Sequence, residues 1–198
     1  MTTRALNSLQ SRKHDIDLIA NNLNRLCVDE SIITKASIIL MAYNMIEGVF
    51  FILLQDFFDH VQTDFSVLDS SEKLKDLILR YHLKIINNDY DRFKIFHNKK
   101  NMEIPDFPKF KDTVVLFSGN LDAKKIRDIS KRFDVTYPGH SGDESLLYIK
   151  NIRNKLAHGE LGYAVACRDK TDAEIVKCVN NAFNYMNRVV NAFVQKYS

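Results

Sequence analysis

The chain has 198 residues, of which 45% are hydrophobic, so it is long and apolar enough to bury the core of one domain. Its six glycines and three prolines are few for a β-sandwich or barrel, and the composition favours a mainly α fold. The net charge of +3 is only mildly basic and does not by itself indicate a nucleic-acid partner. We therefore predict a single helical domain that spans residues 1–198.

The first two helices are predicted over residues 3–26 and 31–61. The first is amphipathic, while the second is the most apolar element, because Glu47 is its only charge between Lys35 and Asp56. A carboxylate in the middle of a membrane span costs about 2.5–3.5 kcal/mol on insertion scales. We therefore interpret the second helix as the buried centre of a bundle or as a subunit interface, and we expect no membrane association.

A third helix is expected to begin at Ser70 or Ser71, each a suitable N-cap, and to break near Asn87–Asn88. Residues 97–112 contain two prolines and a cluster of lysines, which indicates an irregular connection. Residues 114–117 are apolar and predict either a short strand or a buried extended segment.

A fourth, basic helix is predicted over residues 121–133, and residues 137–142 form a turn. Ser141 with Glu144 has the spacing of a capping box for a fifth helix that ends at His158.

The last helix is predicted over residues 172–197, and Thr171 with Glu174 repeats the capping box at its start. The resulting architecture is an α-helical bundle of about five main helices, with a short mixed insert between the third and fifth helices.

Three cysteines, Cys27, Cys167 and Cys178, are odd in number, far apart and not spaced as metal ligands. They are most simply reduced thiols, and no apolar signal segment follows Met1–Arg4, so we expect a cytoplasmic protein. Residues 92–132 hold eleven Lys and Arg against five Asp and Glu. This basic segment faces either phosphates or solvent.

The stretch from Asn151 to Gly159 places an arginine where a structural helix does not need one. Arg153 lies about 60° from the centre of an apolar helical stripe, at 100° per residue, so its charge is directed toward the core. Asn154 and His158 are four residues apart on the flank of that stripe, and Gly159 is a stop signal. The stripe consists of Leu146, Ile149, Ile152 and Leu156.

Glu47 and Arg153 each interrupt an otherwise apolar helix face. An unpaired buried charge is costly, so we predict that the two approach each other or that both face a polar cleft. The alternative is a buried ion pair that only fixes helix register. His158 also has a structural alternative, since a histidine at a helix C-terminus is stabilised by the macrodipole.

Two stretches, Leu116–Arg127 and Arg153–Gly159, resemble blocks found in this order in bacterial HEPN-domain nucleases of mobile and defence loci. In the HEPN superfamily an arginine, usually followed by a polar residue, stands four to six residues before a histidine near a helix end. Here four residues separate Arg153 from His158. With the long apolar helix, the resemblance covers residues 30–195.

The resemblance implies a metal-independent endoribonuclease of the toxin or phage-defence type, with no cofactor. RNA supplies its own nucleophile, the 2′-hydroxyl, so the protein needs a proton-transfer group and a cation. His158 is the implied general acid or base and Arg153 the implied cation, while Asn154 orients the phosphate or the histidine. Glu47 completes the predicted site. The residues expected to contact RNA are Lys124, Lys125, Arg127 and Lys155.

One histidine per chain is a poor acid and base pair, and the family solves this by placing two copies of the motif in one cleft. The resemblance thus implies a homodimer with the active site at its interface, and an antitoxin or defence-system partner protein. Glu160 stands where some HEPN toxins have a tyrosine that a partner modifies, so silencing by that route is not expected. Two alternatives remain: a catalytically silent HEPN module that binds a nucleotide or a protein, and a plain helical scaffold.

Overall fold

The computed structural model describes residues 4–64, 71–86, 91, 103–117, 119–136 and 139–197. Within these ranges the chain is all-helical and contains no strand. The helices are α1 (Arg4–Ala20), the 3-10 helix η1 (Leu23–Arg25), α2 (Val28–Thr63), α4 (Glu72–Ile85), α6 (Phe107–Thr113), α7 (Ala123–Arg132), α8 (Asp143–Ala157), α9 (Tyr163–Ala166) and α10 (Asp172–Tyr197). The predicted mainly α bundle is therefore confirmed.

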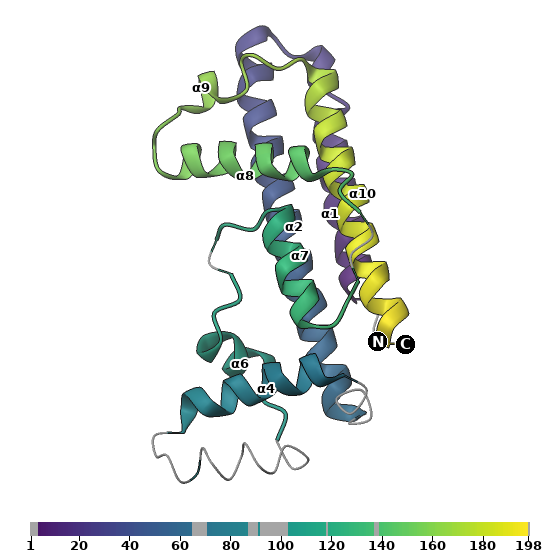
Figure 1. Cartoon of the computed structure of the whole chain (residues 1–198). Helices are drawn as coiled ribbons and strands as arrows, with labels where there is room; N and C mark the ends of the chain where they lie inside the picture. The colour runs from purple at the N-terminus through teal and green to yellow at the C-terminus, as the bar shows by residue number, and fades with distance from the viewer. Residues whose placement is uncertain are drawn as a thin grey trace.

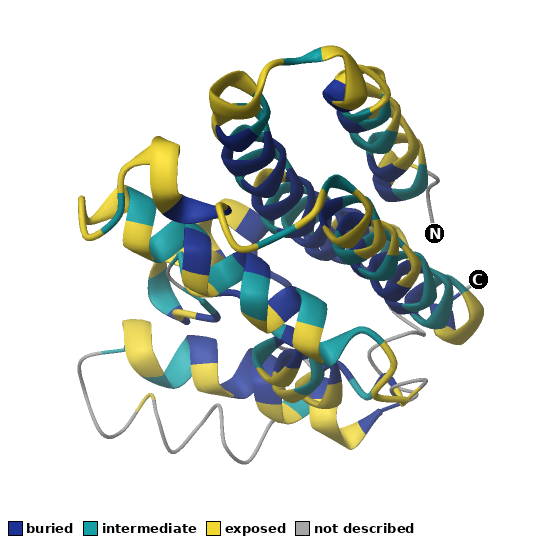
Figure 2. Ribbon diagram, turned by 90° about the horizontal axis from the view of Figure 1, so that it is seen from above, coloured by how far each residue is buried: buried dark blue, intermediate teal, exposed yellow. Residues whose placement is uncertain are grey.

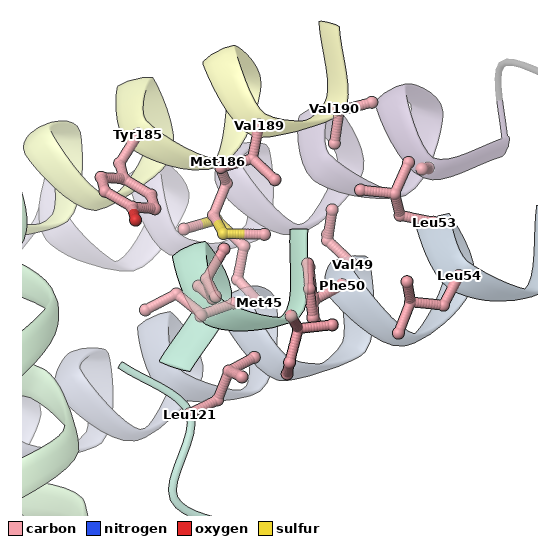
Figure 3. Close-up of a cluster of buried hydrophobic side chains, with 14 of the residues drawn as sticks. Met45, Val49, Phe50, Leu53, Leu54, Leu121, Tyr185, Met186, Val189 and Val190 are labelled. Carbon is pink, nitrogen blue, oxygen red and sulfur yellow. The ribbon is translucent and has the colours of Figure 1, made fainter. Parts of the chain in front are cut away.

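The long helix α2 is the element on which the others pack. Helices α1 and α10 lie along it, α8 crosses it, and α6 packs beside its C-terminal part (Figure 1). Buried residues line the inward side of α2 and α10, while exposed residues face outward (Figure 2). Figure 3 shows side chains of α2, among them Met45, Val49 and Leu53, that face Met186 and Val190 of α10.

Much of the apolar surface of α2 is covered by its own chain. Ala36, Ile39, Met45 and Phe50, for example, are all fully buried. Other apolar side chains of α2, among them Met41, Phe51 and Ile52, are only partly buried. A subunit interface on α2 therefore stays a prediction. By length and composition α2 could cross a membrane, but 56% of its most apolar window is buried inside the chain, as in the core helix of a bundle.

Several predicted helix starts are confirmed by their caps. Ser71 is the N-cap of α4, where its hydroxyl accepts the backbone N–H of Leu74 at 3.4 Å. Before α10, the carboxylate of Glu174 accepts the Thr171 backbone N–H at 2.8 Å, and the Thr171 hydroxyl accepts the Glu174 N–H at 3.2 Å. These contacts form the predicted capping box.

The start of α8 differs from the prediction. The N-cap is Gly142, not Ser141, and Glu144 closes no capping box there. Gly142 has a φ of +100°, which favours glycine, and a Cβ there would lie 3.1 Å from the carbonyl oxygen of Asn181. Close packing against α10, and not a side-chain cap, therefore sets where α8 begins.

The insert also differs in detail. The segment 114–117 is extended but pairs with no strand, and its alternation buries Val114 and Leu116 while leaving Val115 66% exposed. The short helix α6 lies in what was predicted to be an irregular connection, and the first helix ends at Ala20, not at residue 26. The break predicted at Asn87–Asn88 lies outside the described residues.

Candidate active site

Helix α8 carries the Arg153 side chain at the edge of the core. The predicted stripe is confirmed, since Leu146 and Ile149 are fully buried and Ile152 is nearly so. The half-buried guanidinium of Arg153 donates from Nη1 to the backbone oxygen of Gly119 at 3.1 Å and to Oδ1 of Asn154 at 3.0 Å. The charge predicted to point toward the core is thus fixed there by hydrogen bonds.

The aromatic ring of Tyr43, on α2, lies against this guanidinium. Cζ of Arg153 lies 4.7 Å from the centre of the Tyr43 ring, within cation–π range. The Tyr43 side chain is fully buried, and its hydroxyl accepts the backbone N–H of Leu121 at 3.1 Å. Burial raises the pKa of this hydroxyl above its ordinary value, so it stays neutral. One buried tyrosine therefore holds both Arg153 and the segment that begins α7.

The guanidinium keeps one edge available. Arginine has five N–H donors, and Nη1 accounts for both contacts to Gly119 and Asn154. Among the described residues, neither Nε nor Nη2 of Arg153 has a hydrogen-bond partner, and no carboxylate lies within 4.0 Å. This arrangement pre-orients a cation whose free edge can form a bidentate contact with a phosphate.

Further contacts join the two stretches that carried the resemblance. Nδ2 of Asn154 donates to Oδ1 of Asn120 at 2.6 Å, and Nζ of Lys150 lies 2.8 Å from Oδ2 of Asp122. Asp122 also caps α7 by accepting the N–H of Lys125 at 2.9 Å. Burial acts to raise the Asp122 pKa, but the hydrogen bonds from Lys150 and Lys125 outweigh it and hold this pKa below its ordinary value. The first turn of α7 is thereby fixed beside α8.

His158 is the C-cap of α8 and is exposed. Backbone contacts end the helix: the N–H of Gly159 donates to Leu156 O at 3.2 Å and that of Glu160 to Lys155 O at 2.8 Å, which is a Schellman motif. Gly159 has the positive φ, +70°, that this motif requires. No side chain in the described part of the chain bonds to the imidazole, so none of the described side chains fixes its orientation.

Comparison with known protein families identifies the superfamily of this chain. The family model described as MAE_28990-like HEPN matches residues 1–198. The chain belongs to the HEPN superfamily. No curated protein and no solved structure matches the chain. Membership indicates a nuclease-like or nucleotide-related module, and many HEPN domains are ribonucleases.

In this HEPN domain Glu47 does not form the predicted ion pair with Arg153. Their separation exceeds 4.0 Å, and Tyr43, one turn before Glu47 on α2, supports the guanidinium instead. Glu47 is half-buried and lines an open groove of about 790 Å³ that also contains Asn44, Gly48 and Gly119. We name this the α2 groove. Arg153 does not line this groove and is connected to it only through Gly119, whose backbone oxygen accepts a hydrogen bond from Arg153 Nη1. That both charges face one polar cleft stays a prediction.

The basic residues predicted to contact RNA fall into two groups in the HEPN fold. Lys124 and Lys155 are exposed, Lys125 is partly exposed, and none has an ion-pair partner among the described residues. Arg127, in contrast, is only 17% exposed and donates to Asp143 Oδ2 at 2.6 Å. Arg127 therefore ties α7 to the start of α8, and we leave it out of the proposed RNA surface.

The supporting residues Tyr43, Gly119 and Asn120 were not singled out as site residues from the sequence. A signal for Tyr43 existed, because a tyrosine in an apolar helix needs a partner for its hydroxyl. Gly119 and Asn120 stood in the stretch that resembles the family, but nothing local linked them to Arg153. Within the described residues, no group of three or more His, Cys, Asp or Glu is placed to hold a metal ion.

Proposed function

We propose that this protein is a metal-independent endoribonuclease, a toxin or phage-defence effector that cuts RNA by attack of the 2′-hydroxyl. Its membership of the HEPN superfamily supports the reaction class. The observation that carries the proposal is the Arg153 guanidinium, held on Tyr43 and Gly119 with one edge unbound, five residues before an exposed histidine. A helix built only for packing needs neither feature.

Each residue has a distinct role in this reaction. The free edge of Arg153 binds the phosphate and stabilises the charge that develops on it. His158 takes a proton from the 2′-hydroxyl or gives one to the 5′ leaving oxygen, because histidine changes protonation near neutral pH. RNA supplies both nucleophile and leaving group, so these steps need no metal ion.

Asn154 positions the guanidinium of Arg153. Its Oδ1 accepts from Arg153 at 3.0 Å, and its Nδ2 donates to Asn120 at 2.6 Å. We assign Asn154 a positioning role, since its amide is already occupied by protein groups. Lys124, Lys125 and Lys155 are proposed to contact RNA phosphates outside the reacting centre.

The direct test is cleavage of RNA by the purified protein in excess EDTA. We expect unchanged cleavage of a mixed cellular RNA substrate, with 2′,3′-cyclic phosphate ends, because the 2′-oxygen stays on the phosphate. Loss of cleavage on chelation, or products with 3′-hydroxyl ends, would contradict the proposal. Binding of a nucleotide without any cleavage would favour the alternative, a catalytically silent HEPN module.

We also propose that the active form is a homodimer. In-line cleavage uses one group to remove the 2′ proton and another to protonate the 5′ oxygen, and each chain offers one histidine beside Arg153. A second chain would supply the other histidine to the same cleft. Specific activity should fall as the protein is diluted through the dimer dissociation range, measured beside sedimentation velocity. A monomer that remains fully active would contradict this prediction.

The cellular location of the protein and its control by a partner follow from the same proposal. A toxin or defence nuclease that acts on tRNA or mRNA works in the cytoplasm and is held silent by a partner protein until it is needed. Glu160 stands at the position where some HEPN toxins carry a tyrosine that is modified, and the nearest tyrosine, the 43% exposed Tyr163, lies three residues further along the chain. We therefore expect the partner to act by binding.

A further inference from the structure

A second groove joins the α2 groove at Val115. It has a volume of about 620 Å³ and lies between α4, the end of α7 and the extended segment 114–115. We name it the α4 groove. Val115 lines both grooves, and its side chain is 66% exposed because the extended segment turns alternate residues outward. The two grooves are therefore neighbours on either side of Val115, and the α2 groove extends to Gly119, whose carbonyl oxygen accepts a hydrogen bond from Arg153.

The α4 groove is lined by four cations, Lys73, Arg80, Lys84 and Arg132, and by one carboxylate, that of Asp76. Arg80 and Lys84 of α4 and Arg132 of α7 are exposed, and no described Asp or Glu lies within 4.0 Å of any of them. Lys84 contacts only the carbonyl oxygen of Thr113, at 3.2 Å. Lys73, in the same groove, is paired with Asp134 at 2.8 Å. This excess of cations over carboxylates in one groove favours a polyanionic occupant.

The α2 groove adds aromatic surface and another arginine, together with the carboxylates of Glu47 and Asp112. Phe51 and Phe117 line it and are partly exposed, and the amino group of Lys111 lies 5.3 Å from the centre of the Phe51 ring. Arg12 lies across α2 at Gly48, where an added Cβ would be 3.0 Å from its Nη2. Glycine costs about 1 kcal/mol relative to alanine within a helix, and here it makes room for this guanidinium.

We propose that the two grooves form the path of a single RNA strand that leads to Arg153. That the bound molecule is RNA rests on the proposed function. The new elements are the route that the RNA follows over the surface and its single-stranded state. Proteins bind single strands with a basic groove that follows the phosphates and with aromatic rings on which bases stack. Arg80, Lys84 and Arg132 supply the charges, and Phe51 and Phe117 supply the rings. Bases paired in a duplex cannot stack on these rings.

The test measures binding, so it does not depend on cleavage. Full-length protein carrying His158→Ala is titrated into a fluorescein-labelled 12-nucleotide single-stranded RNA, and anisotropy is followed over a range of salt concentrations. The test variant adds Arg80→Gln, Lys84→Gln and Arg132→Gln. A matched control adds Arg25→Gln, Arg168→Gln and Lys177→Gln, which remove the same charge from exposed residues. These residues belong to η1, to the turn after α9 and to the first turns of α10, and these elements lie at the end of the molecule away from α4 (Figure 1).

Each phosphate contact to a single strand contributes about 0.7 to the slope of log K against log salt, which is about five-fold in affinity at 0.1 M. The groove variant should thus bind about a hundred-fold more weakly, with a slope smaller by about 2. The control should stay within about two-fold. Equal loss in both variants, no loss in either, or tighter binding of a duplex of the same sequence would overturn the proposal.

Folding and function are separated within the same experiment. Far-UV circular dichroism and the melting temperature verify that the groove variant is folded. If the triple variant does not fold, the single variant Arg132→Gln is used in its place, with an expected loss of affinity of about five-fold. If RNA binding depends on the groove as expected but the protein with His158 intact never cleaves RNA, the proposed nuclease activity is refuted and the proposed RNA path is retained. If the groove substitutions do not weaken RNA binding but the protein with His158 intact cleaves RNA, the RNA path is refuted and the nuclease activity is retained.

Discussion

Replacing His158 with alanine should lower the rate of RNA cleavage by about a hundred-fold to ten-thousand-fold, because the reaction loses its proton-transfer group. The fold should survive. His158 is exposed at the end of α8, and the Schellman motif that ends the helix is made by backbone groups and Gly159. The imidazole can contribute only a helix-dipole effect of about 0.3–1 kcal/mol, small beside a typical domain stability of about 5–15 kcal/mol.

The matched control is His14→Ala, which removes an exposed histidine from α1. Both variants are compared with the parent by thermal unfolding and by single-turnover cleavage of one RNA. His14→Ala should leave both readouts unchanged. If His158→Ala unfolds the protein, or cleaves at the parent rate, His158 is not the catalytic group, and the structural alternative of a helix-capping histidine gains.

Replacing Arg153 with alanine should also remove cleavage, by about a hundred-fold to a thousand-fold, because a charge-stabilising donor is lost from the transition state. Stability should fall as well, by about 1–3 kcal/mol, since the change removes a contact with Tyr43 and a hydrogen bond to Gly119. A buried pair with Glu47 would have predicted about 3–5 kcal/mol, because its loss strands a carboxylate. No such pair is present within 4.0 Å.

Two companion variants distinguish chemistry from support at this position. Arg153→Lys keeps the charge but loses the planar fork, so it should restore much of the stability and little of the rate. Tyr43→Phe keeps the ring under the guanidinium and removes only the acceptor for the Leu121 N–H, so its rate should stay within a few-fold of the parent. Parent-level cleavage in a destabilised Arg153→Ala would show that Arg153 is structural.

Local chemistry in the sequence determined the main helices and their ends. The apolar run around Glu47 predicted the central helix α2, and the stripe through Leu146 and Ile149 predicted α8, because side-chain periodicity reports which face is buried. Gly159 ended α8 as predicted, and Thr171 with Glu174 capped α10. Helix α6 was missed, since seven residues that include a proline near the helix start resemble a connection.

Only the tertiary structure decided what surrounds Arg153. The sequence showed that this arginine points toward the core, but it could not show that Tyr43 and Gly119, and not Glu47, are its partners. That choice depends on the place where α8 crosses α2, which is set by packing among distant residues, such as the approach of α10 to Gly142. The α4 groove has the same origin, because helices that are separate in the sequence bring its unpaired cations together.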